Sequence, residues 1–218
     1  MPLLNLCMAS YTHTEIESWE RFYRANFINS LTGFKSVSLI GTANRDGQTN
    51  LGVFSSIVHI GSNPALVGYI NRPLAAAPHT LANIEATGVY TINHIHSSFL
   101  QQAHQTSAKY DADISEFEEV GLTPEFKENI SAPFVKESNV KYVLTLQEII
   151  PIKLNDTFLV IGKVMMVEAM DGILGQDGFL HLDKAATVCS NGNDSYYSTQ
   201  LIDRFKYAKP GVNPEKIS

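Results

Sequence analysis

The chain has 218 residues, of which 44% are hydrophobic and 17% are charged. This length predicts one large domain or two small ones, and the apolar content is sufficient for a buried core. The 22 acidic residues outnumber the 16 basic ones, which gives a formal net charge of −6. Because no long basic run is present, we expect no phosphate-tracking nucleic-acid surface. The low charged fraction indicates that part of the surface lies against a partner.

The two cysteines, Cys7 and Cys189, are too few and too far apart for a disulfide framework or a CxxC metal site. This usage fits a reducing compartment. No stretch reaches the ~18 apolar residues of a membrane span, and the N-terminal apolar stretch has no positive flank. We therefore expect a cytoplasmic protein that does not contact a membrane.

The first elements are predicted from two different periods. Thr14 and Glu17 have the spacing of a capping box, and apolar residues then recur at helical spacing as far as Phe27. Beyond this helix the sequence alternates over 36–39, turns at Asp46-Gly47, and returns as a strand over 49–54. Such a pair of strands predicts an antiparallel hairpin, which residues 57–60 extend or bend.

The rest of the chain is interpreted as alternating strands and helices without a regular βαβ repeat. In chain order we first expect a strand at 65–70, a loop at 71–79, a helix from Thr80 to Gly88 with Thr80 as its cap, and a strand at 89–95. A helix at 97–106, a short helix opened by Asp113 and Glu116, and an irregular segment at 124–138 should follow. The last elements are strands at 140–149 and 158–167 and an amphipathic helix at 199–207.

Two groups of titratable residues are assigned no function. His94 and His96 would share one face of a strand, but no third and fourth ligand converge on it, so no metal site is predicted. An acidic cluster is interpreted as a solvated helix face rather than a general-acid pair. Its members are Asp111, Asp113, Glu116, Glu118 and Glu119.

Two segments offer binding chemistry. The strand at 49–54 continues into Ser55 and Ser56, and with Asn50 it presents hydrogen-bonding groups suited to the polar edge of a flat heterocycle. The alternative for this segment is a plain hairpin with a polar strand end.

The second segment resembles a phosphate site. Arg72 and His79 flank the start of the predicted helix at Thr80, where unpaired N–H groups carry partial positive charge. The alternative is an ordinary capped helix with a surface arginine. A ring site followed by a phosphate site suits a mononucleotide such as FMN, although the spacing alone does not identify it.

The runs SVSLIGTANRDGQTNLGVFSS, NPALVGYINRP and HTLANIEATGVYTINHI together resemble the flavin reductase-like family with the FMN-binding split barrel. Later segments follow in the same order, so the resemblance covers about residues 34–197. It implies a mainly β or α+β fold, a six-stranded antiparallel Greek-key split β-barrel with peripheral helices, formed as a single domain over 1–218. It also implies a homodimer with FMN in a groove at the subunit interface.

The resemblance also implies which residues bind the cofactor. The flavin ring and ribityl chain would lie against Asn50, Val53, Phe54, Ser55 and Ser56, and the phosphate against Arg72, His79, Thr80 and Asn83. The segment from Ser107 to Tyr110 would pass near the flavin face or the partner subunit. No catalytic side chain is predicted, because hydride transfer from NAD(P)H to flavin N5 needs no protein acid or base.

The leading hypothesis is an NAD(P)H-dependent flavin reductase that uses a small-molecule electron donor and acceptor. The main alternative is an FMN-bound electron carrier that serves a protein partner without NAD(P)H turnover. A relative of pyridoxamine phosphate oxidase would need a basic substrate-phosphate pocket that the sequence does not show, and a non-flavin binding module on the same barrel stays open. FMN is expected over FAD, because no second Gly-rich or basic loop is present for a pyrophosphate.

Overall fold

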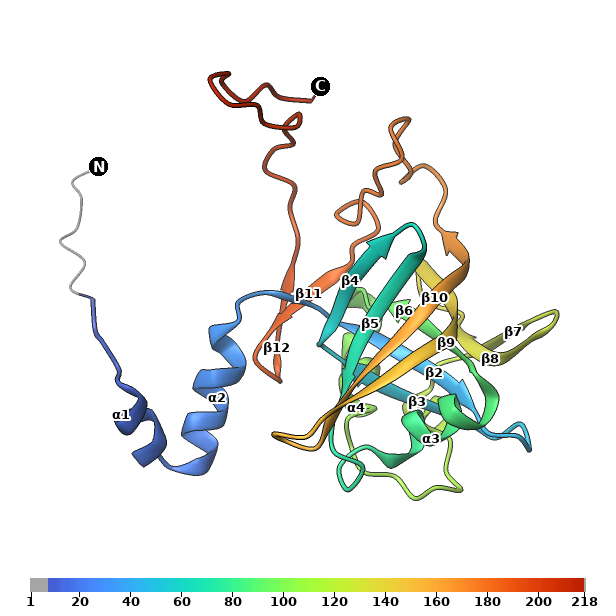
Figure 1. Ribbon diagram of the computed structural model, residues 1–218. Coiled ribbons are helices and arrows are strands. Elements are labelled where there is room, and N and C mark those ends of the chain that lie inside the picture. Colours follow the sequence, from blue (N-terminus) through green and yellow to red (C-terminus); the bar gives the residue numbers. More distant parts are fainter. Residues whose placement is uncertain (1–7, 218) are drawn as a thin grey trace.

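A seven-stranded antiparallel sheet forms the centre of the molecule (Figure 1). The computed structural model describes residues 8–217. Along the sheet the strands are β3 (Thr49–Phe54), β2 (Ser38–Ala43), β6 (Val89–His94), β9 (Val140–Ile152), β10 (Thr157–Ala169), β5 (Ala65–Asn71) and β4 (Ile57–Ser62). The sheet is open, since β3 and β4 at its two ends do not pair with each other. The expected six-stranded barrel was therefore wrong in strand number and in closure.

The seventh strand arises at Ser55 and Ser56. We expected residues 57–60 to extend or bend β3. The chain bends out of the sheet at these two serines and returns as β4, which pairs with β5 at the opposite end. Ser56 O accepts a hydrogen bond from Ile70 N at 3.0 Å, and this bond fixes the crossing. Two small polar residues give a strand no apolar side chain to bury, which is why β3 ends there.

Two smaller sheets were missed by the sequence patterns. The strands β1 (Lys35–Ser36), β11 (Val188–Asn191) and β12 (Ser195–Ser198) form one of them, and the hairpin of β7 (Pro124–Lys127) and β8 (Ile130–Val135) forms the other. The hairpin replaces the irregular segment expected at 124–138. The turn residues between β11 and β12, Gly192 to Asp194, are the local signal that could have revealed that pair.

The C-terminal helix expected over 199–207 is absent from the structure. This segment is extended, and Phe205 forms an isolated bridge with Lys216. Its apolar residues have helical spacing but no apolar surface beside them, since Ile202 is 93% exposed. Spacing without burial does not stabilise a helix.

The helices lie around the sheet and beside it. They are α1 (His13–Ser18), α2 (Arg21–Leu31), α3 (Pro78–Thr87), the 3₁₀ turn η1 (Ser97–Phe99), α4 (Leu100–Gln105) and α5 (Glu116–Val120). Figure 1 shows α1 and α2 as an arm that stands away from the sheet. The short helix α5 begins after Ser115 and has no side-chain cap, so the capping box expected at Asp113 was wrong.

The first predicted helix is interrupted. Its capping box is formed by Thr12 and Glu15 rather than by Thr14 and Glu17: Thr12 N donates to the Glu15 carboxylate at 2.7 Å, and Glu15 N donates to Thr12 Oγ1 at 3.3 Å. Glu20 then accepts hydrogen bonds from the amides of Phe22 and Tyr23, the second and third residues of α2. This second cap divides the helical pattern into two helices.

The β2–β3 hairpin forms at the predicted turn, but its first strand is β2 at Ser38–Ala43 rather than a half-buried strand over 36–39. β3 begins and ends at the expected residues, and Gly47 adopts the positive φ of 84° that the tight turn requires. Asn44 closes the turn, because its side-chain oxygen accepts the N–H groups of Asp46 and Gln48. All of β2 is buried, and its residues contribute to a core on both faces: Leu39 belongs to one cluster and Ile40 to the other.

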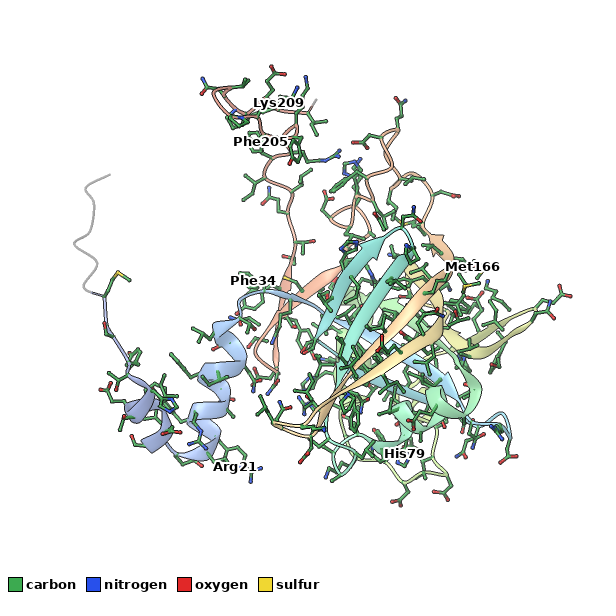
Figure 2. All side chains as sticks on the ribbon, in the orientation of Figure 1. Arg21, Phe34, His79, Met166, Phe205 and Lys209 are labelled. Carbon is green, nitrogen blue, oxygen red and sulfur yellow. The ribbon has the colours of Figure 1, made fainter. Side chains whose placement is uncertain are left out.

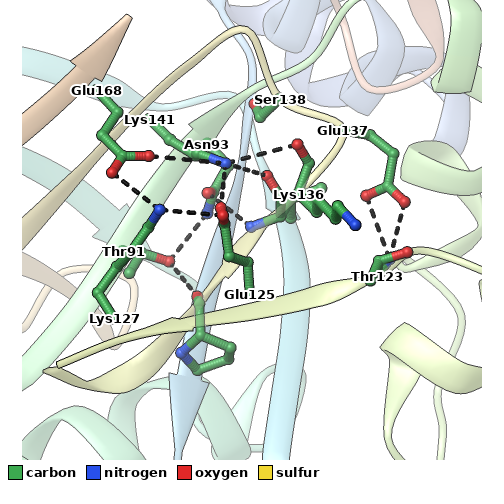
Figure 3. Close-up of polar contacts among 12 residues, drawn as sticks. Thr91, Asn93, Thr123, Glu125, Lys127, Lys136, Glu137, Ser138, Lys141 and Glu168 are labelled. Carbon is green, nitrogen blue, oxygen red and sulfur yellow. Dashed lines mark hydrogen bonds and ion pairs between the residues drawn. The ribbon is translucent and has the colours of Figure 1, made fainter.

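A buried polar network fixes the β7–β8 hairpin on the main sheet (Figure 3). Asn93 donates to Leu39 O at 3.2 Å and accepts from Val135 N at 2.9 Å. Thr91 Oγ1 donates to Pro133 O at 2.6 Å. β8 approaches so closely at this point that a Cβ on Gly41 would collide with the carbonyl oxygen of Pro133.

An ion-pair network reinforces the same hairpin (Figure 3). Glu125 on β7 pairs with Lys141, whose side chain is only 8% exposed, and with Lys127 at 3.0 Å. Lys127 also pairs with Glu168 on β10 at 3.0 Å. The pairs with Lys141 and Glu168 join the hairpin to β9 and β10, contacts that no local sequence pattern reveals.

Stability is expected to fall in mild acid because of His94. Burial lowers the pKa of this imidazole to about 4, below the value of about 6.5 for an unfolded histidine. As the pH falls below about 6.5, the unfolded chain takes up a proton that the folded chain does not bind, so the free energy of unfolding decreases. Between about pH 7.5 and 5 this decrease should be about 2 kcal/mol.

Urea unfolding at both pH values tests this expectation. His94→Gln should lose about 2 kcal/mol of the pH dependence, whereas His59→Gln, at an exposed position on β4, should retain it. The same pH dependence in the wild type and in His94→Gln would contradict the assignment.

Candidate functional site

A cavity of about 460 Å³ is lined by three parts of the fold. One wall is β3 with the two serines that follow it. A second consists of the loop 72–77 and the start of α3, and a third combines the segment 106–110 with parts of β1, β11 and β12. The volume lies in the range of small-molecule sites, roughly 300–1,000 Å³.

The β3 wall combines apolar side chains with a free backbone edge. Val53 packs against one core cluster and Phe54 against the other, so both positions are fixed. Phe54 also makes an edge-on contact with Tyr69, with ring centroids 5.0 Å apart. Because β3 pairs only with β2, its outer edge has no strand partner. Leu51 N points to this edge, and by alternation Val53 N does so too.

Asn50 joins the two predicted halves of the site. Its amide nitrogen donates to Thr80 Oγ1 at 3.0 Å and to Thr42 Oγ1 at 3.4 Å. We expected Thr80 to cap α3, but its hydroxyl bonds Asn50 instead. The cap position is Ala77, and no side chain caps the helix. The N–H groups at this helix start thus have no side-chain acceptor, and Thr80 instead fixes the helix against β3.

The loop before α3 is held in place by Asn71, which is fully buried. Its amide donates to Arg72 O at 2.8 Å and to Ala77 O at 3.3 Å. Arg72 lines the cavity and is exposed, and none of the carboxylates in residues 8–217 lies within 4.0 Å of it. An unpaired guanidinium beside an uncapped helix start favours an anion.

The structure places eight of the nine predicted binding residues in the main cavity wall and one outside it. Asn50, Val53, Phe54, Ser55, Ser56, Arg72, His79 and Thr80 line the cavity. Asn83 does not. Its amide donates to Thr42 Oγ1 at 3.1 Å, and it lines a neighbouring cavity of about 170 Å³. The segment from Ser107 to Tyr110 also lines the main cavity.

Glu116 corrects the interpretation of the acidic cluster. We expected its carboxylate in solvent, but the residue is 7% exposed and accepts the Leu51 N–H at 2.8 Å. Burial raises the pKa of this carboxyl. Glu116 lines both cavities, as Asn50 and His79 do. Its helix neighbours Phe117 and Val120 are core residues, and their i, i+3 spacing was the signal for a buried face.

Of the third wall, only the segment from Ser107 to Tyr110 was predicted. Lys35, Ser190, Asn193 and Tyr196 reach the cavity from the three-stranded sheet and its turn, and Asn29 reaches it from α2. These residues come from opposite ends of the chain, so only the folded structure brings them together.

The geometry is that of an open antiparallel sheet with a cavity of about 460 Å³ beside its end strand β3. A family model described as the flavin reductase like domain matches residues 33–187. The chain belongs to this family, which confirms the resemblance found in the sequence. Its function is accordingly flavin-related, within a family of oxidoreductases.

Solved structures agree with this assignment. A candidate flavin reductase with a split barrel domain from Shewanella frigidimarina NCIMB 400 is 47% identical, with a TM-score of 0.89 over 92% of this chain and 100% of that one. Nitrilotriacetate monooxygenase component B from Bacillus cereus is 20% identical, with a TM-score of 0.78 over 90% and 98%. An FMN-binding protein from Thermus thermophilus is 15% identical, with a TM-score of 0.61 over 76% and 86%. The last two show the fold alone.

The described part of the chain has neither a metal-binding cluster nor a membrane-spanning helix. Within residues 8–217, His, Cys, Asp and Glu side chains do not gather in threes in a way that could hold a metal ion. In the same part of the chain, the helices are too short or too polar to cross a membrane. Cys189 is a free thiol, and Cys7 lies outside the described residues.

Proposed function

We propose that the main cavity binds FMN, with the flavin ring on the β3 side and the phosphate at the start of α3. The observation that carries this proposal is the joining of both walls within one cavity: the free edge of β3 and the uncapped helix beside Arg72 are linked through Asn50 and Thr80. One phosphate-binding end favours FMN over FAD.

The residues present fit such a ligand. The helix N–H groups and Arg72 would hold the phosphate, while Val53 and the two serines would hold the ring and ribityl chain. Phe54 and Asn71 keep these groups in place, because the first packs against the core and the second ties down the loop. When bound, a flavin supplies reversible two-electron chemistry that no side chain provides.

We further propose that the protein is an oxidoreductase that takes electrons from NAD(P)H and passes them to a small-molecule acceptor in the cytoplasm. Support comes from the cations of the cavity: Lys35, Arg72 and Lys109 line it, and within residues 8–217 none has a carboxylate within 4.0 Å. The only carboxylate in the same lining is Glu116, which is buried and accepts the Leu51 N–H. The alternative remains an electron carrier that serves a protein partner.

One measurement tests the FMN site, and a second separates the two functions. Calorimetric titration of the apoprotein with FMN and FAD should show tighter binding of FMN, and equal affinities would contradict the one-phosphate site. Anaerobic mixing of the FMN-loaded protein with NADH or NADPH should then bleach the flavin absorbance within seconds. Stable flavin colour with both donors would favour the carrier.

A homodimer is expected from the apolar side chains that the single chain leaves exposed. Phe22 and Leu31 on the α1–α2 arm are 69% and 67% exposed, and Phe34 beyond it is 65% exposed (Figure 2 labels Phe34). A stable interface should bury at least ~1,000 Å² in total. Sedimentation velocity should give a mass twice that of one chain. A monomeric mass with FMN bound would contradict both the dimer and a site shared between subunits.

A further inference from the structure

Three polar side chains form one row across the three-stranded sheet. Lys35 on β1 lies opposite Ser190 on β11, and Ser190 lies opposite Tyr196 on β12. Residues that are directly opposed in antiparallel strands project from the same face. All three side chains line the main cavity, on a wall separate from β3 and α3. We call this set the Lys35–Ser190–Tyr196 row.

Ser190 is a buried residue whose hydroxyl is unpaired within the described chain. The residue is 2% exposed, and its hydroxyl has no hydrogen-bond partner among residues 8–217. Leaving a buried hydroxyl unpaired costs free energy, so such groups are uncommon unless they serve a function. Because Ser190 lines the cavity, a bound molecule can supply the missing partner.

Lys35 supplies the charge of the row. Its ammonium donates to Asn29 O, near the end of α2, at 3.0 Å. That single bond holds the half-buried side chain and leaves two N–H donors unused. Four other lysines in the described chain form ion pairs, namely Lys127, Lys141, Lys206 and Lys216, whereas Lys35 has no carboxylate within 4.0 Å.

The rest of the row adds donors and no negative charge. The Tyr196 hydroxyl lies 2.7 Å from His104 Nδ1, which fixes the ring at the cavity wall. The Asn193 side chain, in the turn between β11 and β12, lines the same wall. The Lys35 ammonium, the Ser190 alcohol and the Asn193 amide face one space and form a set of donors that suits an anionic oxygen group.

We propose that the Lys35–Ser190–Tyr196 row is a subsite for an anionic oxygen group, a carboxylate or a phosphate, on the molecule that exchanges electrons with the flavin. The inference rests on the proposed function, because it takes the α3 side of the cavity for FMN. It adds the class of the second ligand: an organic anion. Arg72 and the start of α3 then hold the flavin phosphate, and the row holds the anionic group of the donor or acceptor.

The experiment uses the full-length, FMN-loaded protein and three small probes: benzoate, phenyl phosphate and the neutral benzamide. Calorimetry and the flavin difference spectrum both report binding. At least one anionic probe should bind at millimolar concentration, with benzamide about tenfold weaker or more. Comparing the two anions distinguishes a carboxylate subsite from a phosphate subsite.

Lys35→Met should weaken the anionic probe by about tenfold or more, because a charged hydrogen bond is lost. Lys163→Met removes the same charge from an exposed position on β10 outside the cavity and should leave the affinity unchanged. An equal loss in the two variants would show that net charge, rather than the row, attracts the anion.

Ser190→Ala separates a binding role from a structural one. Since its hydroxyl has no partner among residues 8–217, the variant should melt at the same temperature or higher while binding the anionic probe more weakly. A lower melting temperature with unchanged probe affinity would show that Ser190 serves the fold, and it would overturn the proposal.

FMN and riboflavin titrations are run first on each protein. If the wild type does not bind FMN, both the proposed function and the subsite fail. If FMN binds but no anion is preferred over benzamide, only the subsite fails. If Lys35→Met weakens FMN and spares riboflavin, the row holds the flavin phosphate itself, which would also overturn the assignment to a second ligand.

Discussion

Arg72→Ala is expected to weaken FMN binding by about ten- to a hundredfold and to leave riboflavin binding unchanged. The reason is the phosphate, which riboflavin lacks: a hydrogen bond to a charged group contributes roughly 1.5–3 kcal/mol. Arg72 has no carboxylate partner within the described chain, so its removal breaks no ion pair of the protein itself. Fluorescence titration with the two flavins measures both affinities.

A matched control separates this effect from a general loss of positive charge. Arg21→Ala removes an arginine from α2, on the arm that stands apart from His79 and the start of α3 (Figure 2). It should change neither affinity. Equal losses of FMN and riboflavin in Arg72→Ala would mean that the arginine acts on the ring or on the fold. Unchanged FMN affinity in Arg72→Ala would show that Arg72 is a surface residue with no part in binding the phosphate.

The parts of the site that the sequence predicted are those encoded by local patterns. β3 follows its hairpin turn at Asp46-Gly47, and the start of α3 follows a Pro-containing loop, so period and turn chemistry locate both. The contact between them was not predictable. Thr80 has the composition of a helix cap, yet its hydroxyl bonds Asn50 on another element. A capping preference is worth only about 1 kcal/mol, so a tertiary contact readily overrides it.

The missed parts depend on residues that are far apart in the chain. Lys35 and Ser190 become neighbours only through the pairing of β1 with β11, and a two-residue strand carries no detectable period. The β7–β8 hairpin depends likewise on the pairing of Glu125 with Lys141. Conversely, the tail at 199–207 has a helical period but no partner surface. Local periodicity therefore indicated a helix at 199–207 that does not form. It also gave no sign of the two small sheets that do form.

Asn93 makes contacts in the core with residues that are far apart in the chain. Of the substitutions considered, its removal should have the largest effect on stability. The side chain is fully buried and joins Leu39, Thr91 and Val135 by hydrogen bonds of 3.2, 2.9 and 2.9 Å (Figure 3). Asn93→Ala leaves the Val135 N–H without its acceptor and opens a small cavity. Each buried group left unpaired costs about 1–3 kcal/mol, so a total loss of about 3 kcal/mol is expected.

For a chain of this length, such a loss should lower the melting temperature by roughly 10 °C. Asn26→Ala is the matched control, because Asn26 lies exposed on α2, where a surface substitution changes stability by less than about 0.5 kcal/mol. Since Asn93 ties β8 to the strand next to β3, the wall proposed for the flavin ring should loosen with it. FMN should then protect Asn93→Ala against thermal unfolding, because a ligand that binds only the folded state raises its stability. If Asn93→Ala melts with the control, β8 is held by apolar packing alone, and the polar network is dispensable.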